Sequence, residues 1–176
     1  HCELLNEVSK EQKKFFMYLH YSKIHTGIKN NVLKKYTNFS EEYFCNLEIN
    51  KKRYRDLFQE SEEYLNSVLE TIFSLQLDKN SIILIMSDHG ISVGEKIGEI
   101  AYGAFCYDYT LKTCSMIKFP ENSPSELNQQ VRTIDMMPTI LDILDIEIDD
   151  KFDKLDGKTL MPLISGKGML EEFAYS

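Results

Sequence analysis

The chain has 176 residues, 43% of them hydrophobic and 27% charged, the composition of a globular domain large enough to bury a core. The formal net charge is −8, and the lysines and arginines stand in short separate groups, so we expect no nucleic acid among its partners. No apolar run approaches the length of a membrane span.

The N-terminal half alternates helical and strand-like patterns. Residues 2–12 are typical of the end of a helix, and the aromatic and aliphatic segment 15–21 predicts a strand. Residues 22–35 indicate a loop, and residues 36–46 a helical or irregular segment.

The next two elements give the clearest signals. In residues 50–77, apolar side chains recur every three or four positions, Phe58 and Phe73 among them, which predicts a long amphipathic helix. A turn at 78–80 leads into the apolar run 81–87, which indicates a strand buried on both faces. With the strand at 15–21, these segments predict a βαβ unit with parallel strands.

The C-terminal half has shorter elements. Glycines interrupt residues 91–112, as is typical of a loop that faces a substrate. Residues 113–119 predict a third strand. Asp135 is expected to cap a helix that carries Pro138 in its first turn and runs to about Leu144. After an acidic connector, residues 160–164 predict a short helix or turn.

The segment Ser87–Gly90, Ser-Asp-His-Gly, follows the 81–87 strand directly. Ligands of α/β folds bind beyond the carboxyl ends of the strands, and a carboxylate next to an imidazole can begin a divalent-metal site. The alternative at this stage is a simple turn, in which Asp88 caps the next segment and His89 lies at the surface.

Five segments in order resemble the sulfatase family of the alkaline-phosphatase superfamily. They are Phe15–Tyr21 with its following His25, Ser87–Gly90, Met116–Pro120, Val131–Leu144 and Asp156–Gly166. The resemblance implies a three-layer α/β/α fold with a mostly parallel central sheet. We expect residues 1–176 to form a single domain, the C-terminal part of a sulfatase-like catalytic domain that is incomplete at both ends.

In this family the residues aligned with Asp88 and His89 bind a divalent cation. Calcium-dependent sulfatases usually have Asp-Asn there, and the Asp-His form also occurs in relatives that act on phosphate and phosphonate groups. Because imidazole is a softer ligand than an amide, His89 shifts the expected metal from calcium toward manganese, zinc or magnesium.

The resemblance gives His25 and Lys96 catalytic roles. His25 would bind an ester oxygen or protonate the leaving group, which suits an imidazole near neutral pH; the residue before it is Ile24 where the family has proline, and a plain loop histidine is an equal alternative. Lys96 would bind the substrate's anionic oxygens, but it comes early for that role, and a solvated lysine is the interpretation its position favours.

The family's nucleophile, a cysteine or serine in a C/S-x-P-S-R segment or a directly used serine or threonine, has no counterpart here. The four cysteines, at 2, 45, 106 and 114, lack that context and form no Cys-x-x-Cys pair. We expect free thiols, with Cys106 and Cys114 packed, not reactive. Free thiols favour a cytoplasmic location. Localisation stays open because any signal peptide would precede residue 1.

The expected function is therefore metal-dependent hydrolysis of a small-molecule or glycan sulfate ester, with the nucleophile upstream of residue 1 and the chain inactive alone. Two alternatives remain on the same fold. One is a phosphoryl or phosphonate hydrolase or a phosphoethanolamine-type transferase, and the other is a non-catalytic binding module.

Overall fold

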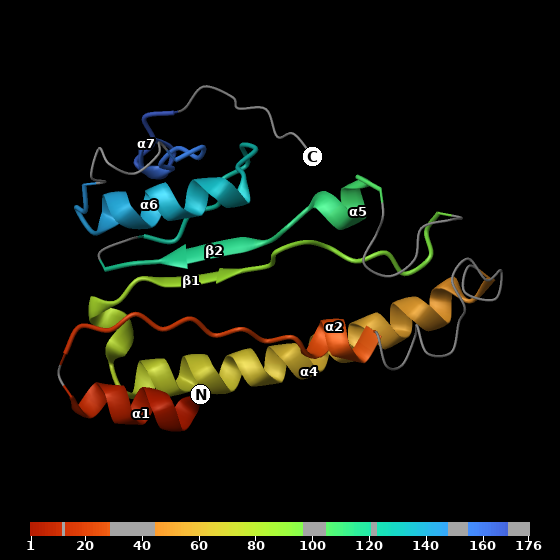
Figure 1. The fold of residues 1–176 in the computed structure, drawn as a ribbon, viewed down its shortest axis with the longest axis horizontal. Helices are drawn as coiled ribbons and strands as arrows, with labels where there is room; N and C mark the ends of the chain where they lie inside the picture. The colour runs from red at the N-terminus through yellow and green to blue at the C-terminus, as the bar shows by residue number, and fades with distance from the viewer. Residues whose placement is uncertain (12, 29–44, 97–104, 121–122, 148–154, 169–176) are drawn as a thin grey trace. The chain divides into compact units, whose positions relative to one another are not determined.

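The structure, a computed structural model, describes residues 1–11, 13–28, 45–96, 105–120, 123–147 and 155–168 (Figure 1). The chain divides into two compact units, His1–Pro120 and Glu121–Ser176. The predictions for residues 29–44, the glycine-containing stretch 97–104 and most of the acidic connector lie outside the described residues.

The first unit is built on the long helix α4 (Leu47–Ser74), which confirms the helix predicted over 50–77. Its side chains Leu57 and Val68 are buried, as the apolar periodicity requires. Phe58 and Phe73 of the predicted apolar face are instead 53% and 48% exposed. The predicted apolar face is therefore wider than the buried one.

Two further helices pack on α4. Helix α1 (Cys2–Lys10) buries Leu5 and confirms the helix predicted at residues 2–12. Helix α2 (Lys23–Ile28) lies in the segment predicted as a loop, so that prediction is wrong there. A Cβ on Gly27 of α2 would overlap the side chain of Leu57, so glycine allows the two helices to approach this closely.

The strand predicted at residues 15–21 is not formed. Residues 13–22 have an extended backbone without strand or helix, run beside α4 in Figure 1, and expose Phe16 (88%) and Tyr18 (77%). Tyr21 at the end of the segment stacks on Tyr64 of α4, with ring centroids 4.1 Å apart. A strand needs a hydrogen-bonded neighbour, and the only sheet among the described residues has two other strands.

That sheet pairs β1 (Ile83–Met86) with β2 (Ser115–Lys118), so two of the three predicted strands are confirmed. They run antiparallel, with Ile83 opposite Lys118 and Met86 opposite Ser115. The β1 residues are half-buried and Met86 is exposed, so the expectation of burial on both faces is wrong for this strand. The 3-10 helix η2 (Leu77–Asn80) forms the predicted turn into β1.

The second unit contains the 3-10 helix η3 (Thr133–Asp135), α6 (Met136–Ile143) and α7 (Met161–Ile164), which confirms both predicted helices. Among its described residues, the buried apolar side chains are those of Met136, Leu160 and Leu163. None of the helices that the structure describes combines the length and apolar composition needed to cross a lipid bilayer.

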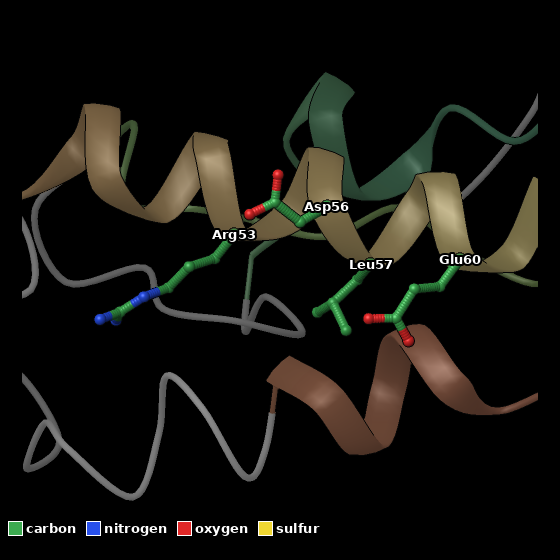
Figure 2. A pocket seen from close by; sticks show the side chains of 4 residues that line it. All are labelled: Arg53, Asp56, Leu57 and Glu60. Carbon is green, nitrogen blue, oxygen red and sulfur yellow. The ribbon is translucent and has the colours of Figure 1, made fainter.

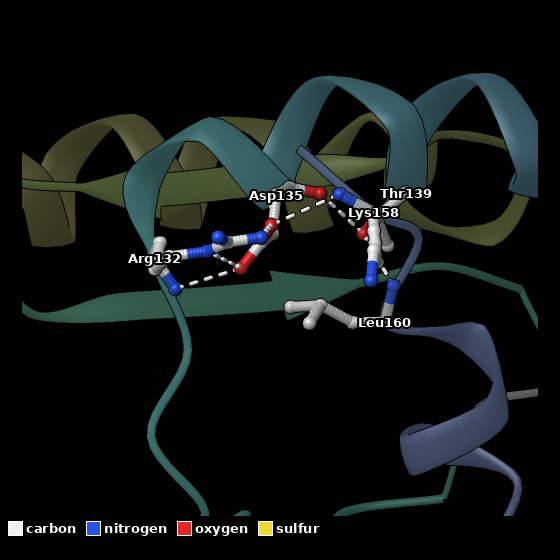
Figure 3. A network of polar contacts seen from close by, with 5 residues as sticks. All are labelled: Arg132, Asp135, Thr139, Lys158 and Leu160. Carbon is white, nitrogen blue, oxygen red and sulfur yellow. Dashed lines mark hydrogen bonds and ion pairs between the residues drawn. The ribbon is translucent and has the colours of Figure 1, made fainter. Parts of the chain in front are cut away.

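Asp135 does not cap α6 with its side chain, contrary to the sequence prediction. Its carboxylate instead accepts hydrogen bonds from the backbone N–H and the guanidinium of Arg132 and from the backbone N–H of Lys158 (Figure 3). Burial alone would raise the pKa of this carboxyl, but these bonds and the Arg132 charge bring the pKa below its ordinary value. The buried Thr139 hydroxyl continues the network by accepting from the N–H of Leu160 at 2.9 Å.

Candidate active site

The first pair of candidate residues stands just beyond the carboxyl end of β1. The Oδ2 atom of Asp88 and the Nε2 atom of His89 are 3.7 Å apart, and their side chains are 83% and 41% exposed. Two ligands bound to one cation at about 2.1 Å lie at most about 4.2 Å apart, so both atoms fit one ion. The structure thus brings the two predicted metal ligands together on an accessible surface.

The imidazole of His89 is oriented by the backbone carbonyl of the next residue, Gly90. Its Nδ1 atom lies 2.7 Å from the carbonyl oxygen of Gly90, which can only accept a hydrogen bond, so Nδ1 carries the proton. In the neutral ring the lone pair is then on Nε2, beside the Asp88 carboxylate. Metal-binding histidines typically donate their second ring nitrogen in this way. The donor set therefore fits a divalent cation.

Gly90 fixes these residues to the turn that precedes β2. Its N–H donates to the carbonyl oxygen of Thr110 at 2.9 Å, and Thr110 belongs to the short helix α5 (Asp108–Leu111). A Cβ on Gly90 would overlap the backbone carbonyl of Tyr109. Glycine at position 90 therefore lets the α5 backbone touch the Asp88–His89 segment.

A second tie holds the loop that follows. Asn50 of α4 is 1% exposed, and its amide donates to the carbonyl oxygen of Val93 at 3.1 Å. Within the loop, the carboxylate of Glu95 accepts from the Ser92 hydroxyl and from the Val93 N–H. These bonds fix the loop between His89 and Lys96. Asn50 was not predicted from the sequence. Its only signal there is that it is a polar residue on a helix predicted from its apolar spacing.

Lys96 lies at the end of this tied loop. Its Nζ atom is 5.2 Å from the ring centroid of Tyr107, a cation–π contact that joins the 92–96 loop to the 105–111 turn. Both segments are fastened near the Asp88–His89 pair, one through Asn50 and the other through Gly90. Lys96 is exposed, as the solvated lysine favoured by the sequence would be, and its ammonium also lies over the Tyr107 ring.

His25 lies on α2 and is exposed. Its helix is fixed to α4 by the Gly27–Leu57 contact and by an ion pair between Lys23 and Glu60 at 3.1 Å. Among the described residues, no group of three or more histidines, cysteines, aspartates or glutamates is arranged to hold a metal ion. The described part of the chain therefore offers Asp88 and His89 as two ligands of a site that needs more.

An open hollow of about 370 Å³ lies on the surface of α4 and is lined by Arg53, Asp56, Leu57 and Glu60 (Figure 2). Asp56 pairs with Lys52 at 2.7 Å, and Glu60 with Lys23. Because both carboxylates already have cationic partners, this hollow is a weaker candidate than the Asp88–His89 pair.

The four cysteines are free thiols. The expectation that Cys106 and Cys114 pack is wrong, since both are exposed. Cys114 instead extends the β-ladder, because the N–H of Ser87 donates to its carbonyl oxygen at 3.0 Å.

Comparison with known proteins decides the family. The family model described as Sulfatase matches residues 3–146, which include both candidate ligands. The chain belongs to the sulfatase family. An uncharacterized sulfatase, YidJ, of Escherichia coli K12 is 29% identical over 96 residues, 54% of this chain and 18% of that protein. An ulvan-active sulfatase of Formosa agariphila is 25% identical over 107 residues, 59% of this chain and 20% of that protein.

Two solved structures show the same fold. The putative sulfatase yidJ from Bacteroides fragilis superposes with a TM-score of 0.72 at 18% identity, over 96% of this chain and 40% of that one. The crystal structure of Ps i-CgsB gives a TM-score of 0.66 at 17% identity, over 94% and 36%. The chain thus spans about a fifth of the length of the curated sulfatases and about two fifths of the solved ones.

Proposed function

We propose that this chain supplies part of the catalytic domain of a metal-dependent sulfatase that hydrolyses sulfate esters of glycans. The observation that carries the proposal is the Asp88–His89 pair, with two donor atoms 3.7 Å apart and the imidazole oriented by the Gly90 carbonyl. Family membership supplies the reaction class. The bound cation would be manganese, magnesium, zinc or calcium, with the nitrogen ligand favouring the first three.

The proposed domain is a three-layer α/β/α sandwich with a mostly parallel sheet, of which β1 and β2 are two strands. The family match supports a single domain because it runs across the boundary between the two compact units at residues 120 and 121. Only part of such a domain lies in these 176 residues, given the share of the sulfatases that the chain spans.

Each candidate residue has a distinct role in the proposed reaction. Asp88 and His89 hold the cation, which supplies Lewis-acid polarisation of the sulfate group when bound. Lys96 donates hydrogen bonds to the anionic sulfate oxygens. Its positive charge attracts them although the chain as a whole has a net charge of −8. His25 gives its proton to the alcohol oxygen that leaves sulfur, because imidazole exchanges protons near neutral pH. The nucleophile that attacks sulfur comes from a part of the sulfatase fold that this chain does not span.

A glycan is the proposed substrate because one relative is named for a polysaccharide and one structural neighbour was solved with an oligosaccharide. One is an ulvan-active sulfatase, and Ps i-CgsB has been crystallised in complex with k-i-k-neocarrahexaose. The exposed position of Asp88 agrees with a large substrate, since a polysaccharide ester can reach a surface site that is open on its outer side.

A phosphoryl or phosphonate hydrolase is the second candidate. The observation that favours it is His89 itself, because a nitrogen ligand beside Asp88 binds cations that also activate phosphate esters. The two candidates share the fold and the cation, so the bond that is cleaved has to be measured directly.

The test is release of inorganic anion by the purified full-length protein. Sulfated oligosaccharide and phosphate monoester are supplied separately after chelation and after readdition of Mn²⁺, Mg²⁺, Zn²⁺ or Ca²⁺. We expect cation-dependent sulfate release that exceeds phosphate release by at least about tenfold in kcat/KM. The reverse ratio would establish the second candidate, and no release of either anion with any cation would reject both enzymes in favour of a non-catalytic binding module.

A further inference from the structure

Aromatic side chains gather on the turn that touches the Asp88–Gly90 segment. The rings of Phe105 and Tyr107 meet edge to face with centroids 6.1 Å apart, and Phe105 is 56% exposed. The turn that carries them is bound to Gly90 through the 2.9 Å hydrogen bond to Thr110. An aromatic pair, with Phe105 exposed and Tyr107 half-buried, is therefore held on the turn whose backbone bonds to Gly90.

Lys96 lies between these rings and the place where the sulfate group of the proposed substrate would bind. Its Nζ atom is 5.2 Å from the centroid of the Tyr107 ring. A sulfate oxygen bound by Lys96 lies about 2.8 Å from Nζ, and the carbon that bears the ester is only one oxygen away from the sulfur. The organic group of a sulfate held by Lys96 can therefore reach the Tyr107 ring when the ester oxygen points toward it.

We propose that Tyr107 and Phe105 form a subsite for the sugar ring that carries the sulfate ester. The inference rests on the proposed function, because it takes the substrate to be a sulfated glycan whose anion contacts Lys96. One face of a pyranose presents C–H groups with partial positive charge, and these pack on the electron-rich faces of aromatic rings.

The shape of the pair suits a sugar with substituents on its edge. The interplanar angle between Phe105 and Tyr107 is 63°, so the two rings form a corner in place of a flat plate. A ring seated on Tyr107 would meet Phe105 at its side. We expect this corner to determine which sugar unit is accepted, while Asp88, His89 and Lys96 determine that the substituent is an anion.

The experiment measures KM and kcat of the full-length protein on a sulfated galactan oligosaccharide, together with the inhibition constant of inorganic sulfate. Phe105→Ala and Tyr107→Ala are expected to raise KM about tenfold, while the inhibition constant of sulfate, which has no ring, changes less than about twofold. Tyr107→Phe keeps the ring and should restore most of the affinity. Phe73→Ala is the matched control, because Phe73 has similar exposure (48%) at the far end of α4.

The proposal is overturned if Phe105→Ala and Tyr107→Ala have the same KM as Phe73→Ala. Phe105 is exposed, so its variant tests the subsite even where Tyr107→Ala lowers the melting temperature. If the wild-type protein cleaves no sulfate ester, the proposed function fails, and calorimetric titration of the same oligosaccharide decides the subsite separately. A dissociation constant about tenfold weaker in Phe105→Ala supports it, and equal constants or no wild-type binding reject it.

Discussion

The N–H of Gly90 donates to the carbonyl oxygen of Thr110 at 2.9 Å, so the residue after the Asp88–His89 pair is tied to the turn before β2. The Tyr109 carbonyl occupies the place that a Cβ on Gly90 would take. The candidate metal ligands and the aromatic turn are consequently held in one arrangement by backbone contacts.

Gly90→Ala should therefore separate the two segments. We expect a loss of about 1–3 kcal/mol in the free energy of unfolding, measured by urea denaturation, and a fall of at least tenfold in kcat/KM. Gly168→Ala is the control, because Gly168 has φ of +76° but nothing within 4 Å of its Cβ position. Gly90 itself has no positive φ, so its effect should come from the overlap with the Tyr109 carbonyl, and equal effects of the two substitutions would contradict that cause.

His89→Asn should change the preferred cation. An amide oxygen is a harder ligand than an imidazole nitrogen, so we expect activity restored after chelation to shift from Mn²⁺ or Zn²⁺ toward Ca²⁺. The measurement is the cation concentration for half-maximal activity, with wild type and variant titrated in parallel. An unchanged order of cations would show that His89 is not a ligand.

Asn50→Asp should loosen the loop that carries Lys96. The substitution keeps the shape of the side chain but removes the N–H that donates to the Val93 carbonyl, in a site that is 1% exposed. We expect a destabilisation of about 1–3 kcal/mol and a rise in KM for a sulfate ester. Asn6→Asp removes a similar bond, to the Cys2 carbonyl at 2.8 Å, on an exposed surface and should cost less than about 0.5 kcal/mol.

Asp135→Asn should destabilise the second unit. The Asp135 carboxylate is 4% exposed, and Arg132, its partner, 15% exposed, so the variant leaves a largely buried cation without its counter-ion. We expect a cost of about 2–4 kcal/mol in urea denaturation at pH 7. Asp108→Asn removes a pair with Lys112 whose side chains are 83% and 78% exposed, and should cost less than about 1 kcal/mol.

The same carboxylate predicts a pH dependence. Because the pKa of Asp135 is lowered in the folded chain, its contribution to stability is complete above the ordinary pKa of an aspartate. The contribution is lost as the pH falls through the lowered value, when the carboxyl becomes protonated. Wild type should therefore lose more stability than Asp135→Asn between pH 6 and pH 3, and parallel loss in the two proteins would contradict this assignment.

The sequence predicted those elements whose signal is local. The amphipathic spacing of α4, the apolar run at β1 and the proline-containing turn of α6 are all properties of consecutive residues, and all three elements form. The strand at 15–21 is wrong because a strand depends on a partner that local pattern does not supply. Helix α2 was missed because its six residues are too few for a periodic signal.

The candidate site also has a part that could be predicted from the sequence and a part that could not. Asp88 and His89 are adjacent in sequence, so the motif alone predicted their proximity. The contact of Lys96 with Tyr107, the tie from Asn50 and the approach of Tyr109 to Gly90 join segments 11 to 43 residues apart, and only the folded chain brings them together. The catalytic role predicted for His25 stays a proposal.

The most direct test of a cation-dependent reaction at Asp88 is the rate of sulfate release from a sulfated oligosaccharide. The rate is measured for the full-length protein with Asp88→Ala, at saturating cation. The matched control is Asp108→Ala, an aspartate of the same 83% exposure that makes a surface ion pair. We predict that Asp88→Ala lowers kcat/KM by at least about a thousandfold, while Asp108→Ala stays within about twofold of wild type. Sulfate release by Asp88→Ala at the rate of Asp108→Ala would contradict this prediction, because the reaction would then not depend on a cation held by Asp88.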